Sequence, residues 1–259
     1  MRPYGRSTWL FIVPAAALMG LLLLPLLALA VRGLMDDFVA YALAPSALAA
    51  LRLSLVTSAI SVIIAVATGT PLAYLLARWR FRGRAWLDLL LDLPVVLPPS
   101  VAGLALLIAF GRQGIFGAGL SALGISLPFT TAAVVLAQTF VSAPLYVRAA
   151  RVGFGSIDGQ LEESAFVEGA NQWQLFRFVM LPLSARALLS GAILCWTRAL
   201  GEFGATILFA GNLEGRTQTM PLAIYLGLER GLGVALALSV MLLAVSLALL
   251  AVLRRMDEK

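Results

Sequence analysis

Six long apolar segments restrict this chain to one class of fold. A run of about twenty apolar residues can cross a bilayer as a helix. Such segments lie near Trp9–Val31, Leu51–Ala77, Leu87–Phe110, Phe129–Val147, Ala187–Phe209 and Leu232–Leu253. The 259 residues are 61% hydrophobic and only 12% charged, a composition that indicates a membrane protein rather than a soluble domain. We therefore expect an all-α, polytopic membrane protein with about six transmembrane helices, forming a single domain over residues 1–259.

The first apolar segment has two interpretations, a cleaved signal peptide or a retained membrane anchor. Ala28-Leu29-Ala30 is an acceptable cleavage pattern for a signal peptide, and it follows the basic residues Arg2 and Arg6. The apolar part of the segment is longer than the roughly 7–15 residues of a signal-peptide core. A retained membrane anchor is therefore the favoured interpretation.

The positive charges predict how the helices are oriented. The cytoplasmic ends of membrane helices carry an excess of arginine and lysine. If the N-terminus is cytoplasmic, the inner side receives thirteen of these residues, including the run Arg78-x-Arg80-x-Arg82-x-Arg84. The outer side then receives five, and Arg198 is left inside a span. We therefore expect both termini, and the polar segment Glu162–Pro182, to be cytoplasmic.

The composition also excludes several kinds of chemistry. The chain has no histidine, which removes histidine-ligated metals and histidine general bases. Its single cysteine, Cys195, lies in an apolar run, where a structural role is favoured over a reactive one. The only lysine is Lys259, so a phosphate-binding loop with Gly-Lys-Ser/Thr is impossible and ATP would have to be bound by another polypeptide. The net charge of +6 comes from arginines beside apolar spans, which indicates contact with membrane lipid rather than nucleic acid.

The longest polar interruption of the apolar pattern is Glu162–Pro182. Its pattern predicts a short helix over Leu161–Glu168, a break at Gly169, and a second short helix over Trp173–Val179 that stops before Pro182. A solvated loop joining two membrane spans is the simplest interpretation of such a segment. The spacing of its small and acidic residues points to a more specific one.

Glu163-x-Ala165, Gly169 four residues on, and then Val179-x-Leu181-Pro182 resemble the EAA signature of ABC importer permeases. In that family this loop is cytoplasmic and docks into a groove on a separate ATPase subunit. By this resemblance the docking loop covers residues 161–182. Its docking residues are Glu162, Glu163, Ser164, Ala165, Gly169, Leu181 and Pro182. Ser164 stands where the signature usually has alanine, a small-for-small change.

Hydroxyl residues mark one face of the second apolar segment. Ser54, Thr57, Ser58 and Ser61 recur at helical spacing. Small hydroxyl side chains let membrane helices approach closely and form hydrogen bonds across the interface. Helix packing is therefore the favoured role for this face, and lining of a pore is the alternative.

The third apolar segment contains Pro94, Pro98 and Pro99. Prolines inside a span remove backbone donors and bend or break the helix. We expect this segment to be bent and to lie inside the bundle or beside a translocation path, with Ser100 as a candidate lining residue. Asp88 and Asp92 lie one turn apart in it, and we expect them to pair with arginines of the Arg78–Arg84 loop. The run LPVVLPPSVAG also resembles the corresponding span of oxyanion importer permeases.

The fifth apolar segment carries two opposite charges. Arg198 and Glu202 are one helical turn apart and can neutralise each other, because an isolated charge in a bilayer is costly. Gly201 and Gly204 allow close helix contact in the same region. The pair either locks the fifth helix or lies on a face that guides substrate. The candidate translocation path comprises Ser100, Arg198, Glu202, Gly204 and Thr206. The following polar stretch, NLEGRTQT, is either solvated or contacts a ligand or an extracytoplasmic partner.

TRALGEFGATILFAGN followed by GRTQTMPLAIY resembles the permease subunit of molybdate/tungstate ABC importers. The resemblance implies a six-helix permease that works as a homodimer in the inner (plasma) membrane of a bacterium or archaeon. It also implies two partner ATPases that bind ATP and Mg, and an extracytoplasmic protein that delivers a tetrahedral oxyanion. The chain itself would hold no cofactor and catalyse no reaction. Sulfate/thiosulfate permeases share much of the pattern and are the nearest alternative.

Two further classes of function are weighed against this one. An ATP-independent channel or ion-coupled carrier predicts uptake by the chain alone, and no inverted repeat typical of carriers is evident in the sequence. An intramembrane enzyme needs a convergent set of polar residues. Asp88 and Asp92 lie at the edge of a span and fit this requirement poorly.

Overall fold

The computed structural model describes residues 9–35 and 37–257, and every regular element in these ranges is a helix. The predicted all-α architecture is confirmed. The elements are α1 (Trp9–Met35), α2 (Phe38–Ala42), α3 (Pro45–Arg78), α4 (Arg84–Val96), α5 (Pro99–Phe110), α6 (Gly117–Ala122), α7 (Thr131–Gly155), α8 (Gly159–Val167), α9 (Gln172–Gln174), the π-helix η2 (Leu175–Met180), α10 (Leu181–Leu200), α11 (Gly204–Ala210), α12 (Met220–Arg230) and α13 (Leu232–Asp257).

The long helices match the predicted membrane spans. Within the described residues, five helices are long and apolar enough to cross a bilayer: Trp9–Met35, Pro45–Arg78, Thr131–Gly155, Gln172–Leu200 and Leu232–Met256. Helices α4 and α5 together meet the same test and are bent by 114° relative to each other. Counting this bent pair as one span gives six, as the apolar segments predict.

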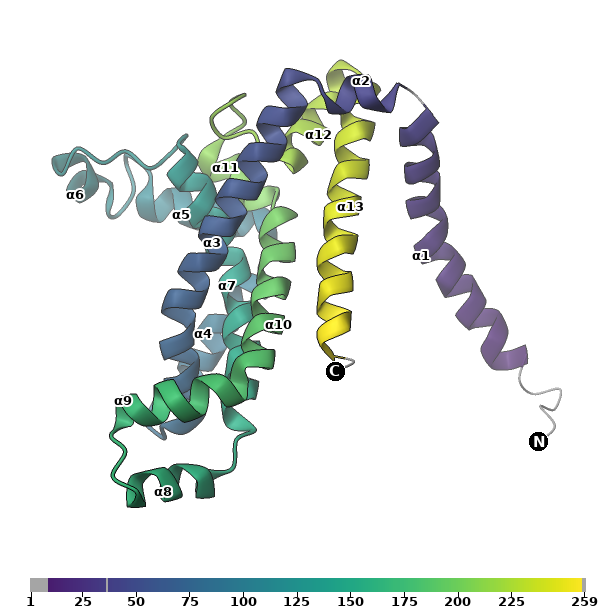
Figure 1. The fold of residues 1–259 in the computed structure, drawn as a ribbon. Helices are drawn as coiled ribbons and strands as arrows, with labels where there is room; N and C mark the ends of the chain where they lie inside the picture. The colour runs from purple at the N-terminus through teal and green to yellow at the C-terminus, as the bar shows by residue number, and fades with distance from the viewer. Residues whose placement is uncertain (1–8, 36, 258–259) are drawn as a thin grey trace.

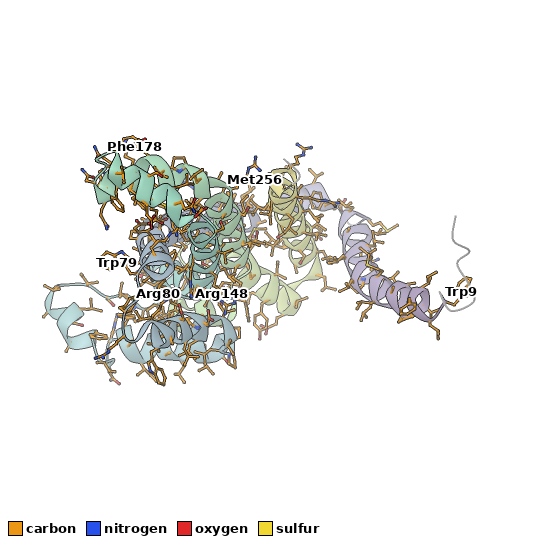
Figure 2. The ribbon with its side chains drawn as sticks, turned by 90° about the horizontal axis from the view of Figure 1, so that it is seen from below. Trp9, Trp79, Arg80, Arg148, Phe178 and Met256 are labelled. Atoms are coloured by element: carbon orange, nitrogen blue, oxygen red, sulfur yellow. The ribbon has the colours of Figure 1, made fainter. Side chains whose placement is uncertain are left out.

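The helices form a central bundle with one outlying helix. Helices α3, α7 and α10 pack against one another at the centre, and α13 lies beside them. Helix α1 stands apart from the bundle in both overall views, with Trp9 at its far end (Figures 1 and 2). It meets α13 at a crossing where Gly33 lies against the backbone of Leu236 and the side chain of Val240. The rest of α1 is almost entirely exposed, as expected for a membrane helix that is surrounded by lipid.

One end of the bundle carries the connection between the fourth and fifth spans. Helices α8 and α9 project beyond the long helices at this end, and the beginning of α1 and the end of α13 lie toward the same side (Figure 1). We refer to it as the α8 end. Because α1 begins and α13 ends on this side, the chain crosses the bundle an even number of times, in agreement with six spans.

Prolines bend the third span, as predicted. Helix α4 ends at Val96, and Leu97 and Pro98 adopt extended backbone angles before Pro99 begins α5. Proline cannot donate a hydrogen bond, and it forces the preceding residue out of the helical region, so two consecutive prolines end one helix and start another. Pro94 remains inside α4 without ending it.

The prediction that the second helix of the docking loop stops before Pro182 is wrong. Helices α9, η2 and α10 run on as one helix from Gln172 to Leu200, and Pro182 lies in the first turn of α10. The π-helix explains this continuity. The amide of Leu181 donates to the carbonyl of Phe176, five residues back, so the hydrogen-bond register has already shifted where proline removes a donor.

The fifth span also ends earlier than predicted. The apolar pattern indicates one helix over Ala187–Phe209, but α10 ends at Leu200 and a separate short helix, α11, begins at Gly204. Gly201 follows the last helical residue, and Phe203 has non-helical angles of φ −121° and ψ −54°. The glycine weakens the helix, and the buried side chain of Glu202 occupies the break.

Hydroxyl groups of α3 hold the bundle together, which confirms the packing role predicted for this face. Ser54, Thr57, Ser58 and Ser61 are all fully buried. The Trp196 indole of α10 donates to the Ser58 hydroxyl at 2.9 Å, and the Met220 amide of α12 donates to the Ser54 hydroxyl at 2.7 Å. The Ser61 hydroxyl donates to the carbonyl of Val135 in α7 at 3.1 Å. These bonds join α3 to three other helices.

The predicted partners of Asp88 and Asp92 are wrong. Asp92 pairs with Arg148 at 2.6 Å and Asp88 pairs with Arg151, so both carboxylates contact α7 rather than the Arg78–Arg84 loop. The two aspartates lie on the face of α4 that packs against α7. Arg78 is already engaged with Glu162.

Candidate functional site

The first helix of the docking loop has defined caps at both ends. Helix α8 begins at Gly159, where the Asp158 carboxylate accepts a hydrogen bond from the Gln160 amide at 3.0 Å. At the other end the amide of Gly169 donates to Phe166 and the amide of Ala170 donates to Ala165. This pair of bonds is a Schellman motif, which requires a left-handed residue after the helix. Gly169 supplies it with φ +88°.

The second half of the docking loop begins with a capping box. The Asn171 side chain accepts from the Gln174 amide at 2.9 Å, and the Gln174 side chain accepts from the Asn171 amide at 2.8 Å. The π-helix that follows buries Leu175 and Met180 in the core at the α8 end. The burial of these two side chains fixes the helix that begins at Gln172 to the bundle, and this helix continues directly into α10.

The predicted docking loop carries several large apolar side chains that are exposed. The exposed fractions are 48% for Leu161, 43% for Phe166, 88% for Val167, 63% for Trp173 and 68% for Phe178. Phe178 is seen from below in Figure 2. So many large apolar groups on a short exposed segment indicate contact with a partner or with the membrane.

The seven predicted docking residues occupy four kinds of position. Glu163, Ser164 and Pro182 are exposed, and Gly169 forms the turn. Ala165 and Leu181 are half-buried and pack against the core of the bundle. Glu162 is turned inward, with its carboxylate 2.8 Å from the Arg78 guanidinium at the end of α3. The structure therefore brings all seven onto one compact hairpin and ties that hairpin to a membrane helix.

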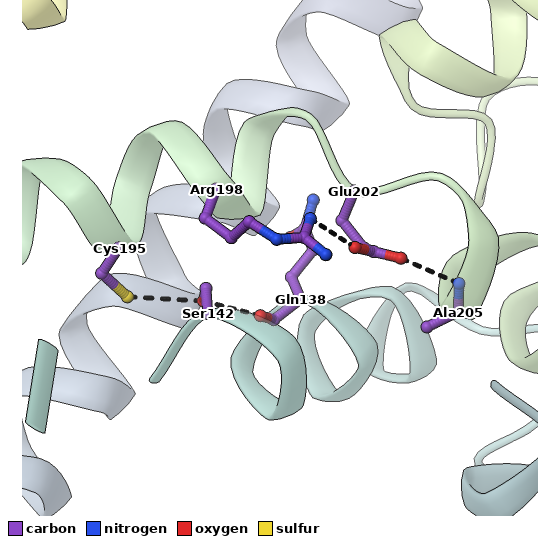
Figure 3. A network of polar contacts seen from close by, with 6 residues as sticks. All are labelled: Gln138, Ser142, Cys195, Arg198, Glu202 and Ala205. Atoms are coloured by element: carbon purple, nitrogen blue, oxygen red, sulfur yellow. Dashed lines mark hydrogen bonds and ion pairs between the residues drawn. The ribbon is translucent and has the colours of Figure 1, made fainter. Parts of the chain in front are cut away.

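A second polar site lies at the break between α10 and α11 (Figure 3). Glu202 is only 1% exposed, and its two carboxylate oxygens have different partners. One lies 2.6 Å from Arg198 Nη1, and the other accepts from the Ala205 amide at 2.8 Å. The predicted Arg198–Glu202 pair is confirmed. Because Glu202 also binds the first turn of α11, it joins the two helices across the break.

Arg198 and its neighbours divide into exposed and buried positions. The side chain of Arg198 is 33% exposed, and Ser100 at the start of α5 is exposed as well. Thr206 is fully buried, and its hydroxyl has no hydrogen-bond partner in the structure. One turn before Arg198 in α10, buried Cys195 donates to Ser142, a contact that fits the structural role predicted for the cysteine.

Gly204 brings two broken spans into contact. A Cβ atom added there would lie 2.4 Å from Pro99 Cβ, far inside van der Waals contact. A Cβ on Gly103 would likewise lie 2.9 Å from the backbone of Ala205. Gly201 differs, because the nearest atom to its added Cβ is the Thr197 carbonyl at 3.7 Å. Close helix approach therefore depends on Gly204 and not on Gly201.

We expect Gly204→Ala to lower the stability of the protein by about 1–3 kcal/mol, the usual cost of overpacking a close contact. Gly201→Ala is the matched control, because it adds the same methyl group three residues away, where the nearest atom is at an ordinary van der Waals distance. The thermal midpoint of each detergent-solubilised variant, followed by tryptophan fluorescence, measures the difference. Equal midpoints for the two variants would contradict the close contact between α5 and α11.

The stretch after α11 is more buried than its polar sequence suggests. Thr217, Gln218 and Thr219 are buried, so the interpretation of NLEGRTQT as a solvated loop is wrong for this half. The Thr217 hydroxyl accepts from the Leu213 amide at 2.9 Å, and the Gln218 side chain donates to Asn212 at 3.0 Å. Arg216 alone among Arg216–Thr219 is exposed. Most of these polar groups therefore shape the loop itself.

Sequence reasoning missed Arg148 and Arg151 as partners at the α8 end. Arg148 and Arg151 lie about one helical turn apart, as do Asp88 and Asp92. Two arginines and two aspartates at the same helical spacing were the signal from which their pairing could have been predicted. Among the described residues, no cluster of three or more histidine, cysteine, aspartate or glutamate side chains could hold a metal ion.

Known proteins with similar sequences or folds are membrane transport components. The chain is 44% identical over 244 residues to the molybdenum transport system permease protein ModB of Mycobacterium tuberculosis (strain ATCC 25618 / H37Rv), covering 94% of this chain and 92% of the relative. It is 37% identical over 207 residues to the sulfate transport system permease protein CysT of Escherichia coli (strain K12), covering 80% and 75%.

Solved structures share the architecture. A chain of a bacterial alginate ABC transporter, crystallised with its alginate pentasaccharide-bound periplasmic protein, superimposes with a TM-score of 0.75 at 18% identity, covering 97% of this chain and 94% of that one. At this identity the likeness concerns the fold alone. The model of the family described as binding-protein-dependent transport system inner membrane component matches residues 69–259. The helical fold, the span pattern and these matches establish that the chain belongs to the family of inner membrane components of binding-protein-dependent transport systems.

Proposed function

We propose that this protein is the permease subunit of an ATP-driven importer for molybdate or tungstate. Two copies would form the path across the membrane, two cytoplasmic ATPase subunits would bind ATP and Mg, and an extracytoplasmic binding protein would deliver the anion. The chain would carry out transport and no covalent chemistry, and it would need no cofactor of its own.

The observation that carries this proposal is the rigid, exposed docking loop at the α8 end. Its hairpin is capped at both helices, its apolar side chains are uncovered, and Leu175 and Met180 anchor it in the bundle. A partner that grips this hairpin can therefore move the α10 span directly. Glu162, Glu163, Ser164, Ala165, Gly169, Leu181 and Pro182 are proposed as the residues that form or present the docking surface.

The charge distribution supports a cytoplasmic α8 end. The arginine run at 78–84, together with Arg148 and Arg151, lies at the ends of helices on that side, as the positive-inside rule requires of a cytoplasmic face. With this orientation both termini are cytoplasmic, and the break between α10 and α11 lies toward the outer half of the membrane.

The proposed path for the anion runs beside the contact between α5 and α11. Both spans are broken there, and irregular backbone at membrane depth occurs where protein or a water-filled route covers it. Ser100, Arg198, Glu202, Gly204 and Thr206 surround this contact. Arg198 offers a partly exposed positive charge to a passing anion, and Glu202 keeps that charge from binding the anion too tightly.

Transport would follow an alternation between inward-open and outward-open states. Closure of the two ATPases on ATP would draw the two docking hairpins together. The continuous helix from Gln172 to Leu200 would transmit this movement toward the break at Glu202. The anion would then reach the path from one side at a time.

The choice of molybdate over sulfate rests on the relatives. The molybdenum permease is 44% identical with nearly complete coverage of both chains, whereas the sulfate permease is 37% identical over a shorter alignment. A sulfate or thiosulfate permease is the second candidate.

The proposal is tested by reconstituting the permease with its ATPase and binding protein in liposomes. We expect uptake of radiolabelled molybdate that requires ATP inside the vesicle and the binding protein outside, with a tenfold excess of sulfate competing weakly. Sulfate uptake at the same rate would favour the second candidate. Uptake by the permease alone, without nucleotide, would indicate an ion-coupled carrier or a channel and overturn the proposal.

A further inference from the structure

Helix α4 is loosely held by apolar packing. None of its residues is buried, and the large apolar side chains of Trp86, Leu89, Leu90 and Val96 are more than half exposed. Leu91 is the residue of α4 that packs against the core at the α8 end. Within one chain, α4 is therefore held by a small number of specific contacts.

Two parallel ion pairs supply those contacts. Asp92 binds Arg148 Nε at 2.6 Å, and one turn earlier Asp88 binds Arg151. Arg148 is seen from the α8 end in Figure 2. Asp88 and Asp92 share one face of α4, and the two arginines share one face of α7. Two pairs along one edge fix both the distance and the rotation of α4 relative to α7, which one pair cannot do.

The side chains of these pairs are partly exposed at the edge of the third span. The exposed fractions of the side chains are 52% for Arg148 and 38% for Asp92, and 35% for Arg151 and 26% for Asp88. Where water reaches the edge of the span, ion pairs of this kind add little to the free energy of unfolding. They act as a fixed spacer between two helices.

The helix that receives these pairs leads straight into the docking loop. Helix α7 ends at Gly155, and α8 begins four residues later at Gly159. Arg78 at the end of α3 holds this junction, donating to the Ile157 carbonyl at 2.8 Å and pairing with Glu162 of α8 at 2.8 Å. The last turns of α3 and α7 and the first turn of α8 therefore form one connected unit.

The other end of α4 leads to the proposed path. After the bend at Leu97 and Pro98, α5 packs on α11 through the contacts of Gly103 with Ala205 and of Pro99 with Gly204. A displacement of α4 must therefore move the start of α5 against the break that Glu202 spans.

We propose that Asp88 and Asp92 are positioning residues that couple the docking loop to the α5–α11 contact by tying α4 to α7. The inference rests on the proposed function, in which a partner moves the docking loop. It adds a second mechanical route, through α4 and α5, beside the direct one along α10. Without the two pairs, α8 can move while α4 and α5 stay behind.

The first test compares coupling in the reconstituted importer. We expect Asp92→Arg, which places two arginines face to face, to lower the number of molybdate ions imported per ATP hydrolysed at least fivefold, with ATPase assembly unchanged. The charge swap Asp92→Arg/Arg148→Asp should restore this ratio to within twofold of the wild type. Arg80→Gln is the control, because it removes an exposed positive charge at the same end that lies outside these pairs.

The second test measures the position of α4 without relying on transport. Spin labels on Trp86→Cys in α4 and Val152→Cys in α7, both exposed, report the distance between the helices in a Cys195→Ser background. We expect one narrow distance in the complex with and without ATP, and a broad distribution after Asp88→Arg/Asp92→Arg.

The outcomes separate the two proposals. An unchanged distance distribution in the doubly substituted protein, or a wild-type ion-to-ATP ratio in Asp92→Arg, would overturn the coupling role of the aspartates. The coupling role would also be overturned if the charge swap Asp92→Arg/Arg148→Asp did not restore the number of molybdate ions imported per ATP hydrolysed. A wild-type complex that imports no molybdate, while α4 broadens as expected, would instead refute the proposed substrate and leave the tie between α4 and α7 supported.

Discussion

Glu202→Gln should lower both the thermal stability of the protein and its rate of transport. Glutamine keeps an oxygen that can accept from the Ala205 amide, but it removes the negative charge 2.6 Å from Arg198. A charged residue at the centre of a membrane helix costs about 2.5–3.5 kcal/mol when unpaired. Since the Arg198 side chain is 33% exposed, we expect a smaller loss, of about 2 kcal/mol. The thermal midpoint in detergent and anion uptake in liposomes measure the two effects.

The double variant Arg198→Gln/Glu202→Gln distinguishes the two interpretations of this pair. If the two charges serve only to neutralise each other at the break between α10 and α11, removing both should restore stability and transport together. If Arg198 also contacts the anion, stability should return while uptake stays at least tenfold below that of the wild type. A wild-type midpoint and a wild-type uptake rate in Glu202→Gln alone would show that the pair serves neither purpose.

Features set by local sequence were predictable in this chain. Length and apolarity identified the spans, and the prolines of the third span predicted that it is bent. The spacing of four residues placed Arg198 beside Glu202 even though the helix ends between them. The capped turn at Gly169 also follows from local chemistry, because only glycine readily adopts its left-handed angle.

Features set by tertiary contacts were not predictable. The partners of Asp88 and Asp92 depend on how α4 lies against α7, which no property of α4 alone reveals. The π-helix that precedes Pro182 buries Leu175 and Met180 in the bundle, a tertiary contact that the local sequence does not reveal. The burial of Thr217, Gln218 and Thr219 was hidden because polar residues ordinarily indicate solvent. In each case a neighbour distant in sequence decides the outcome.

Gly169→Ala should weaken binding of the ATPase partner about tenfold without affecting insertion into the membrane. An alanine at φ +88° is strained by roughly 1–2 kcal/mol, and 1.4 kcal/mol corresponds to a factor of ten in an equilibrium constant. The strain acts on the Schellman turn that sets the angle between α8 and the helix beginning at Gln172. Binding of the purified ATPase to the permease in detergent, measured as a dissociation constant, gives the effect directly.

Gly159→Ala is the matched control for this prediction. Gly159 lies at the start of the same helix, and a Cβ atom added at either glycine meets nothing within 4 Å. The two substitutions therefore add the same methyl group to equally open positions and differ in the backbone angle that each must adopt. Loss of ATPase binding with Gly169→Ala alone would show that the partner recognises the angle of the hairpin as well as its apolar side chains. Equal binding by both variants would mean that the exposed groups such as Trp173 and Val167 suffice, because a flexible hairpin could then fold onto the partner.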